Sequence, residues 1–515
     1  MHACLNVDEI VRLIAHELIA SRGRRTAVSL ACCRKSFEDP VLDTLWATQV
    51  ELLPLLKCFP GEVWNEGGCI VSTPTNVHFF LHNDLIRQSF KRLLTATEWA
   101  RFQKYARRMR ELENSGDPED LPLDVFSAIQ GYIINEPFLP NLEAFSLWRI
   151  EGSLVLFVPL FLSLRTTSIF LPFVSDLSEA MVASVVTTLP TLCPHSQEIT
   201  LSLPRDPMIT AAVSEMVLAI NQNTLQKLDI DSPLSEEARE VIYKLPNLRD
   251  LWITIERGVS LPSAPLPNLT RLTIICYNEG DWLRLFDKAM FGKLETVIFH
   301  PRSEHIGDFL EAFERVGLSS SVQNMLLEFY LHTPHSWNPN YSSLLPFTQL
   351  EHLEIQSSCE GGCSSRVDDE LVIKLSRAMP KLEVLQLGNP PCQDLTSGVT
   401  AEGLVALTHH CPNLSTICMH SQVASLSAPP ASPGTTLNTE SSRLWSDCAL
   451  TRLVVGDIPV AEESALVVAL TLLRIFPRIE SIVGVGEGWL KVEDAIRHSK
   501  QIVDFSSKQH PLTAP

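Results

Sequence analysis

The chain has 515 residues and a formal net charge of −19 at pH 7, with 45% hydrophobic and 20% charged residues. A single core stops growing near about 250–300 residues, so this length predicts several domains or a repeat that grows along one axis. The negative charge disfavours broad binding of nucleic-acid phosphates and favours basic or apolar partners. A chain this long does not need disulfides, and its 13 cysteines are compatible with reduced thiols. No apolar run reaches the roughly 20 residues that span a bilayer. We therefore expect a protein of the cytoplasm or nucleus.

The N-terminal stretch, residues 5–46, predicts three short helices. In residues 7–19, steps of three and four place five apolar side chains on one helical face: Val7, Ile10, Leu13, Ile14 and Leu18. A second helix begins at Thr26, and a third begins at Val41 after a break at Phe37 and Pro40. Three helices in about 45 residues form only a small core. Two alternatives follow: the bundle caps the domain after it, or its leftover apolar face binds a partner.

A longer helix is predicted over Trp99–Leu112. One face of this helix is apolar and carries Phe102, Tyr105, Ala106, Met109 and Leu112. The other face is basic and carries Arg101, Lys104, Arg107, Arg108 and Arg110. Aromatic and basic residues together are compatible with RNA binding, but in an acidic chain such a face more often serves solvation and intramolecular pairing. Residues 113–122 predict a turn-rich acidic linker.

From residue 139 onward the sequence is periodic. The repeated unit is apolar-x-x-apolar-x-apolar, and it begins at Leu142, Leu225, Leu248, Leu269, Leu294, Val322, Leu350, Leu382, Leu414 and Leu450. Degenerate copies lie at 164–169, 196–201 and 479–482. The last two apolar positions are two residues apart, so both point to one face of a strand. Amphipathic helices are predicted between units, at 282–289, 306–313 and 371–379.

A strand followed by a helix, repeated many times, predicts an α/β leucine-rich-repeat solenoid. Strands pack about 4.8 Å apart and helices are about 10 Å wide, so we expect a curved parallel sheet inside and helices outside. Unequal periods make the solenoid irregular. A doubly wound nucleotide-binding fold is the alternative, but it needs phosphate-binding glycines after an early strand, and the sequence has none there.

The sequence offers no catalytic, cofactor-binding or metal-binding constellation, so we expect no enzyme and no cofactor. Gly484, Gly486 and Gly488 predict a loop, because the third glycine spacing of a dinucleotide site is missing. His409 and His410 lie at a predicted helix end beside a repeat cysteine. The pair Cys359 and Cys363 lies in a predicted loop.

Together, the N-terminus and the repeats resemble the F-box proteins with leucine-rich repeats, in particular a large group from mushroom-forming (basidiomycete) fungi. The resemblance is carried by DEIVRLIAHEL, by TAVSLACCRKSFEDPVLDTLW and by ELLPLLKCFP directly after them. The helix at 99–112 followed by LPNLEAF also looks like that group. The chain has Asn6-Val7 where the family usually has Leu-Pro.

The resemblance implies the substrate-receptor subunit of an SCF-type ubiquitin ligase, with an F-box that binds a Skp-type adaptor and repeats that bind a protein target. The residues expected at the adaptor are Leu5, Val7, Ile10, Ile14, Leu18, Leu30, Val41, Leu42, Leu45 and Trp46. Some of these must form the core of the bundle, and the sequence does not separate the two sets. The alternative is an interaction scaffold outside the ubiquitin system, whose bundle only caps the solenoid.

The expected domains follow from these patterns. They are an F-box-like bundle over 1–50, a helical and loop connector over 51–138, a repeat array over 139–500 and a tail over 501–515. A long loop, rich in Ser, Pro and Thr, is expected to be disordered over 421–447.

Overall fold

The structure is a computed structural model of residues 1–515. It describes residues 7–64, 90–114, 123–132, 137–147, 150, 152–173, 177–255, 266–276, 291–301, 314–315, 318–330, 341–358, 367–388, 398–419, 449–455, 460–484 and 486–509. The chain divides into two compact units, Met1–Leu248 and Arg249–Pro515. Leu5, the loop 421–447, the Cys359–Cys363 pair and the helices expected at 282–289 and 306–313 lie outside the described residues.

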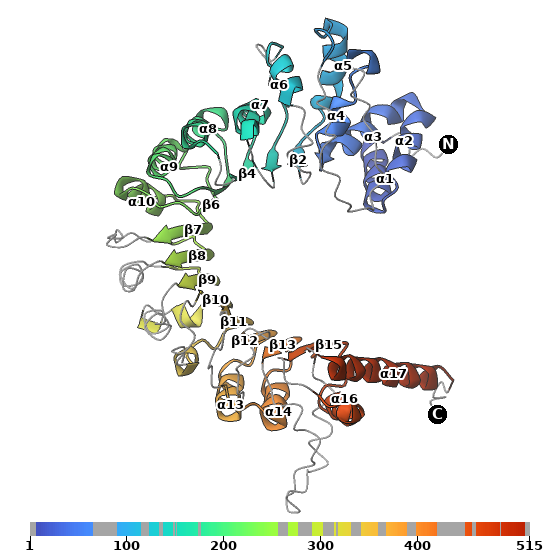
Figure 1. Ribbon diagram of the computed structural model, residues 1–515, viewed down its shortest axis with the longest axis vertical. Coiled ribbons are helices and arrows are strands. Elements are labelled where there is room, and N and C mark those ends of the chain that lie inside the picture. The colour runs from blue at the N-terminus through green and yellow to red at the C-terminus, as the bar shows by residue number, and fades with distance from the viewer. Residues whose placement is uncertain are drawn as a thin grey trace, which may run out of the picture. The chain divides into compact units, whose positions relative to one another are not determined.

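The first unit begins with a bundle of three helices (Figure 1). These are α1 (Asp8–Ala20), α2 (Arg24–Cys33) and α3 (Lys35–Ala47). The break expected at Phe37 and Pro40 is wrong, because α3 starts at Lys35 and both residues lie inside it, buried. Proline in the second turn removes one N–H, and the burial of Phe37, Pro40 and Val41 offsets that loss.

The rest of the first unit alternates strands with helices. Its elements are β1 (Thr48–Gln49), α4 (Leu53–Leu56), η2 (Gly61–Val63), α5 (Ala96–Ala106), β2 (Glu111–Asn114), α6 (Leu123–Gln130), β3 (Ala144–Leu147), η4 (Gly152–Phe157), α7 (Val158–Phe161), β4 (Ser168–Pro172), α8 (Glu179–Leu192), β5 (Glu198–Ser202), α9 (Pro207–Ala219), β6 (Lys227–Ile230) and α10 (Glu236–Tyr243). Strands β1 to β6 lie in sequence order, and their described pairings are parallel. Helices α8 and α9 lie along one face of β4–β6 (Figure 1).

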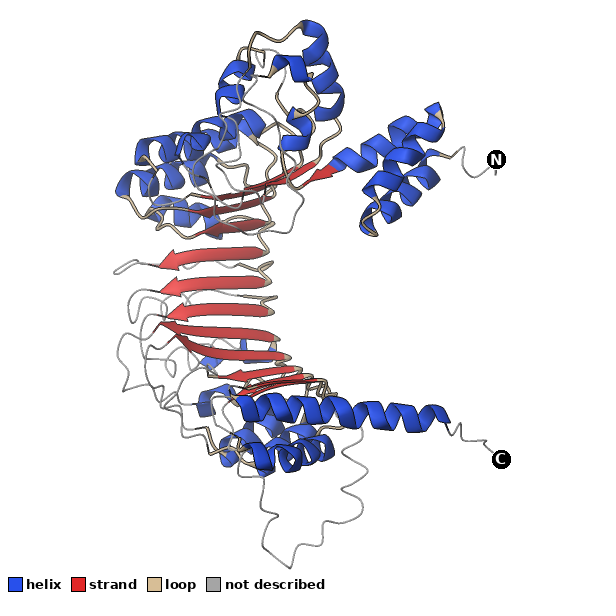
Figure 2. Cartoon of the chain, turned by 45° about the vertical axis from the view of Figure 1, so that its right-hand side comes forward, coloured by secondary structure: helices blue, strands red, loops and turns tan. Residues whose placement is uncertain are grey.

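The second unit continues the same alternation. Its described elements are β7 (Asp250–Ile255), β8 (Arg271–Cys276), β9 (Thr296–Pro301), η5 (Leu318–Ser320), β10 (Asn324–Tyr330), η6 (Tyr341–Leu344), β11 (His352–Ser358), α13 (Asp369–Ala378), β12 (Val384–Leu387), α14 (Ala401–His410), β13 (Thr416–Met419), β14 (Arg452–Val455), η9 (Glu462–Ser464), α16 (Ala465–Ile475), β15 (Ser481–Val483) and α17 (Glu487–Gln509). Strands β7 to β15 also lie in sequence order and pair in parallel (Figure 2).

The α/β leucine-rich-repeat fold predicted from the sequence is confirmed. Every predicted repeat, the three degenerate copies included, overlaps a strand. The apolar positions of the ten regular copies are buried, whereas Leu164, which opens the degenerate copy at 164–169, is 64% exposed. In the copy that begins at Leu382, for example, Leu382, Leu385 and Leu387 are all at most 1% exposed. Leu385 and Leu387 point to the helix side, while Val384 and Gln386, which alternate with them along β12, are only half-buried.

The structure changes three predicted boundaries. The helix expected over Trp99–Leu112 ends at Ala106, and Glu111–Asn114 forms strand β2, in which Leu112 pairs with Phe145. Because β1 and β2 belong to the sheet, strands begin well before residue 139: β1 lies at the end of the region expected as the bundle, and β2 lies in the region expected as a connector. At the other end, α17 continues to Gln509, through most of the expected tail.

Candidate partner-binding surface

The three N-terminal helices enclose a small core of their own. Its buried residues are Val11, Ala15, Ala27, Phe37 and Val41, against which Leu18, Ile19, Leu30 and Ala31 pack. The side of α1 that faces this core therefore carries Val11 and Ala15. Neither belongs to the apolar stripe that the sequence predicts.

A second apolar face of α1 points away from that core. Leu13 is 69% exposed, Val7 43% and Ile14 36%, and Ile10 is half-buried. Ile10, Leu13 and Ile14 are three and four residues apart, which places them on one side of the helix. The predicted stripe is thus mainly an outer face, with Leu18 at the edge of the core. In this unit, α1 has apolar residues on both sides.

The residues expected at the adaptor fall into four groups. Val7, Ile10 and Ile14 lie on the outer face of α1. Val41 is fully buried in the bundle, so it supports the fold and offers no surface to a partner. Leu18 and Leu30 pack against that core. Leu42, Leu45 and Trp46 are half-buried on α3.

Trp46 has a contact within the chain. Its ring lies 5.1 Å from that of Tyr105, at an interplanar angle of 44°. It therefore packs α3 against α5 and is not wholly available to a partner.

The residues expected at the adaptor leave out two exposed apolar side chains of the bundle, Leu13 on the predicted stripe and Val28. Val28 on α2 is 46% exposed. It follows the buried Ala27, and the two cannot face the same side of a helix. The position of Val28 directly after Ala27 therefore indicates that Val28 faces away from the core if Ala27 faces it.

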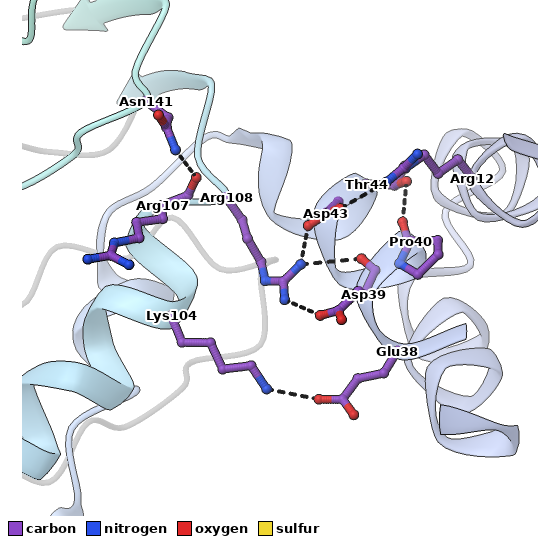
Figure 3. A network of polar contacts seen from close by, with 10 residues as sticks. All are labelled: Arg12, Glu38, Asp39, Pro40, Asp43, Thr44, Lys104, Arg107, Arg108 and Asn141. Carbon is purple, nitrogen blue, oxygen red and sulfur yellow. Dashed lines mark hydrogen bonds and ion pairs between the residues drawn. The ribbon is translucent and has the colours of Figure 1, made fainter. Parts of the chain in front are cut away.

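The bundle meets the rest of the first unit through a network of ion pairs (Figure 3). Lys104 Nζ on α5 lies 2.9 Å from Glu38 Oε1 on α3. Arg108, just after α5, pairs with both Asp39 and Asp43, and it also donates to the Asp39 carbonyl oxygen at 3.3 Å. Arg12 on α1 pairs with Asp43 at 3.2 Å. Acids on one face of α3 thus bridge α1 to the segment that follows α5.

Burial separates the strong contacts of this network from the weak ones. The Arg108 side chain is 13% exposed, whereas Lys104 and Glu38 are 47% and 42% exposed. The hydrogen bond to Glu38 raises the pKa of Lys104. Exposed pairs of this kind contribute little to stability, so Arg108 is the main polar link between the bundle and the repeats.

The basic face predicted at 101–110 is largely used inside the chain. Besides Lys104 and Arg108, Arg110 pairs with Glu143 at 3.1 Å. The intramolecular pairing favoured by the sequence is therefore confirmed for these three cations.

The other candidate sites are structural. The His410 ring accepts a hydrogen bond from Arg377 at 3.4 Å, and burial, followed by the charge of His409, lowers its pKa. The Cys411 thiol donates to carbonyl oxygens of the preceding repeat. Within the described residues, no group of three or more His, Cys, Asp or Glu could hold a metal ion. None of the helices described there is long and apolar enough to cross a membrane.

The sequence matches no known family model and no curated protein. Among solved structures, the chain is similar to a chain of the crystal structure of the Rad7 and Elc1 complex in yeast. The identity is 14%, the match covers 65% of this chain and 81% of that chain, and the TM-score is 0.39.

Proposed function

We propose that the chain is the substrate-receptor subunit of an SCF-type ubiquitin ligase. In this proposal the N-terminal bundle binds a Skp-type adaptor and the repeats bind a protein target. The chain itself makes no covalent bond and acts in the cytoplasm or nucleus. The observation that carries the proposal is the outer face of α1, where Leu13 is 69% exposed although the bundle has a core elsewhere.

Exposed apolar side chains on one helical face are the usual anchor of a helix-mediated contact. Burying this face would gain about 25 cal/mol per Å² of apolar area, reduced by the cost of association. Val7, Ile10, Leu13 and Ile14 supply that area. The resemblance of residues 8–46 to an F-box implies a Skp-type adaptor as the partner.

The capping alternative predicts a different position for the apolar stripe of α1. A bundle that only caps a solenoid turns its apolar stripe onto the first repeat. In this unit the bundle meets α5 through ion pairs and the Trp46–Tyr105 contact, while Leu13 and Ile14 stay exposed. These contacts favour adaptor binding over capping.

Co-elution of the full chain with a recombinant Skp-type adaptor tests the proposal. We expect the double variant Leu13→Glu, Ile14→Glu to weaken binding at least tenfold, because two charges would be buried against apolar adaptor surface. Circular dichroism should show an unchanged fold, since both side chains are exposed.

The matched control is Leu218→Glu on α9, which replaces a leucine that is 48% exposed and should keep full binding. Equal binding by the folded double variant would contradict the proposal. If the wild type does not bind the adaptor and the double variant is destabilised, the capping role is the correct one.

A further inference from the structure

In the first unit, the face of the sheet opposite the helices carries an ordered row of side chains. Alternate residues of β4 and β5, such as Ile169, Leu171 and Ile199, are buried toward the helices. The residues between them point the other way. The register of neighbouring strands joins five of these in one line: Glu113, Ser146, Phe170, Thr200 and Asp229.

Phe170 is the apolar centre of this row. Its side chain is 37% exposed, and its neighbours in register, Ser146 and Thr200, are small and polar. An accessible aromatic side chain of this kind is a common anchor in protein interfaces.

Carboxylates surround this centre. Glu111, Glu113 and Glu198 are exposed on the same face, and Asp229 is half-buried at the end of the row. Within the described residues, Glu111 and Glu198 accept hydrogen bonds from Thr48 and Ser168, not from a Lys or Arg.

One cation lies among these carboxylates. On this face of the described strands β1–β6, Lys227 is the single Lys or Arg, and it lies beside Glu198 in register. The face therefore carries an excess of negative charge around an exposed ring.

We propose that this face binds a basic segment of the target protein, with an apolar side chain against Phe170 and Lys or Arg residues against the flanking carboxylates. The inference rests on the proposed function, because it names the class of target that the receptor holds. Charge complementarity selects a basic segment, and a nucleic acid would be repelled.

The distance between strands determines how far apart the basic residues of the bound segment lie. Strands lie about 4.8 Å apart and an extended chain rises about 3.3 Å per residue, so a segment that crosses two strands uses about three residues. Glu113 and Asp229 each lie two strands from Phe170. The segment that fits therefore has a basic residue three positions before and three positions after its apolar residue.

The test uses fluorescein-labelled peptides and the full chain, with binding followed by fluorescence anisotropy. The probe has a central Phe with Lys at the third position on either side, in a Gly-Ser background. One control peptide has Glu for Lys, and another has both Lys directly beside the Phe. We expect the probe to bind in a salt-dependent way, the Glu peptide not to bind, and the respaced peptide to bind more weakly.

Matched variants then locate the site. Phe170→Ser, and the pair Glu113→Gln with Glu198→Gln, should each weaken binding at least fivefold. The controls Leu218→Ser, and Glu179→Gln with Glu215→Gln, change exposed residues on α8 and α9 and should leave probe binding unchanged.

The inference is overturned if the wild-type chain does not bind the probe, or if the control variants weaken binding as much as the face variants. Adaptor co-elution, measured on the same samples, separates this result from the proposed function. If the wild-type chain binds the adaptor but not the probe, only the inference is refuted. Probe binding without any adaptor binding supports the inference and refutes the ligase assignment.

Discussion

At the scale of single residues, the bundle separates side chains that hold the fold from side chains that are exposed. Phe37 is 3% exposed in the core, whereas Leu13 is 69% exposed on α1. We expect Phe37→Ala to lower the free energy of unfolding of the bundle by about 3–5 kcal/mol, since it removes a ring and leaves a cavity. Leu13→Ala should change it by no more than about 0.5 kcal/mol. Hydrogen–deuterium exchange of residues 8–47 measures both.

Leu13 should matter for adaptor binding although it contributes little to stability. Leu13→Ala should weaken adaptor binding without loss of protection from exchange. A similar loss of protection in both variants would mean that Leu13 is buried in solution, which would contradict the exposed face.

The sequence predicts that α1 is amphipathic but not which side faces the core. Its apolar residues lie on nearly all sides, so periodicity alone picks the stripe with the largest side chains. The core instead uses the small Ala15 and Ala27, because close approach of α1 and α2 requires little volume between them. Only the positions of the other two helices decide this choice.

At the scale of elements, α5 has a capping box that should make its start sensitive to acid. Thr95 and Glu98 cap each other's backbone N–H, and Arg92 binds the Glu98 carboxylate at 2.7 Å. The hydrogen bond to Arg92, followed by that to the Thr95 N–H, lowers the pKa of Glu98 to about 2. The unfolded pKa is near 4.3. At pH between these values the unfolded chain binds more protons, so this contribution to stability falls as pH falls.

The melting temperature of the wild type and of Glu98→Gln, followed from pH 6 to pH 2.5, tests this contribution. We expect the difference between them to be largest above about pH 4.5 and to shrink toward pH 2, as the carboxylate gains its proton. A constant difference over that range would show that the Glu98 charge does not stabilise α5.

The link between α3 and α5 gives a second test at this scale. Arg108 is 13% exposed and binds both Asp39 and Asp43, so Arg108→Ala removes both contacts, although Asp43 keeps its ion pair with Arg12. We expect a loss of about 1–3 kcal/mol. Lys104→Ala, which removes an exposed pair, should cost less than about 1 kcal/mol. Chemical denaturation measures both, and equal costs would contradict the role assigned to Arg108.

Strand positions are predicted well from the sequence because each repeat places two apolar residues two apart, on the buried face of its strand. The boundary between α5 and β2 is not, because Met109 and Leu112 continue the helical spacing of Phe102, Tyr105 and Ala106 by coincidence. Tertiary pairing decides it: Leu112 lies in register with Phe145, and the backbone of Glu143 and Ala144 bonds to the Arg110 carbonyl. A segment that runs beside an existing strand of the array can form the same parallel backbone pairing.

At the scale of the whole molecule, a repeat array is stabilised mainly by contacts between neighbouring repeats. The same logic explains why the sequence predicts the fold better than the partner surfaces. The fold repeats about ten times with one spacing, whereas each surface depends on a few residues that occur once. Phe170, for instance, lies in β4, directly after the degenerate copy at 164–169.

Because each repeat is stabilised by its neighbours, a destabilising substitution in α17 should affect only the elements next to it. Gly488 lies in the first turn of α17, and a Cβ there would lie 1.9 Å from the Val460 carbonyl oxygen. Because that neighbour is backbone, Gly488→Ala must displace α17 from η9 and α16. We expect faster hydrogen exchange in α16 and β15 but unchanged exchange in α8, α9 and the N-terminal bundle, with adaptor binding intact. Faster exchange throughout the chain would instead show that the two units unfold as one cooperative body.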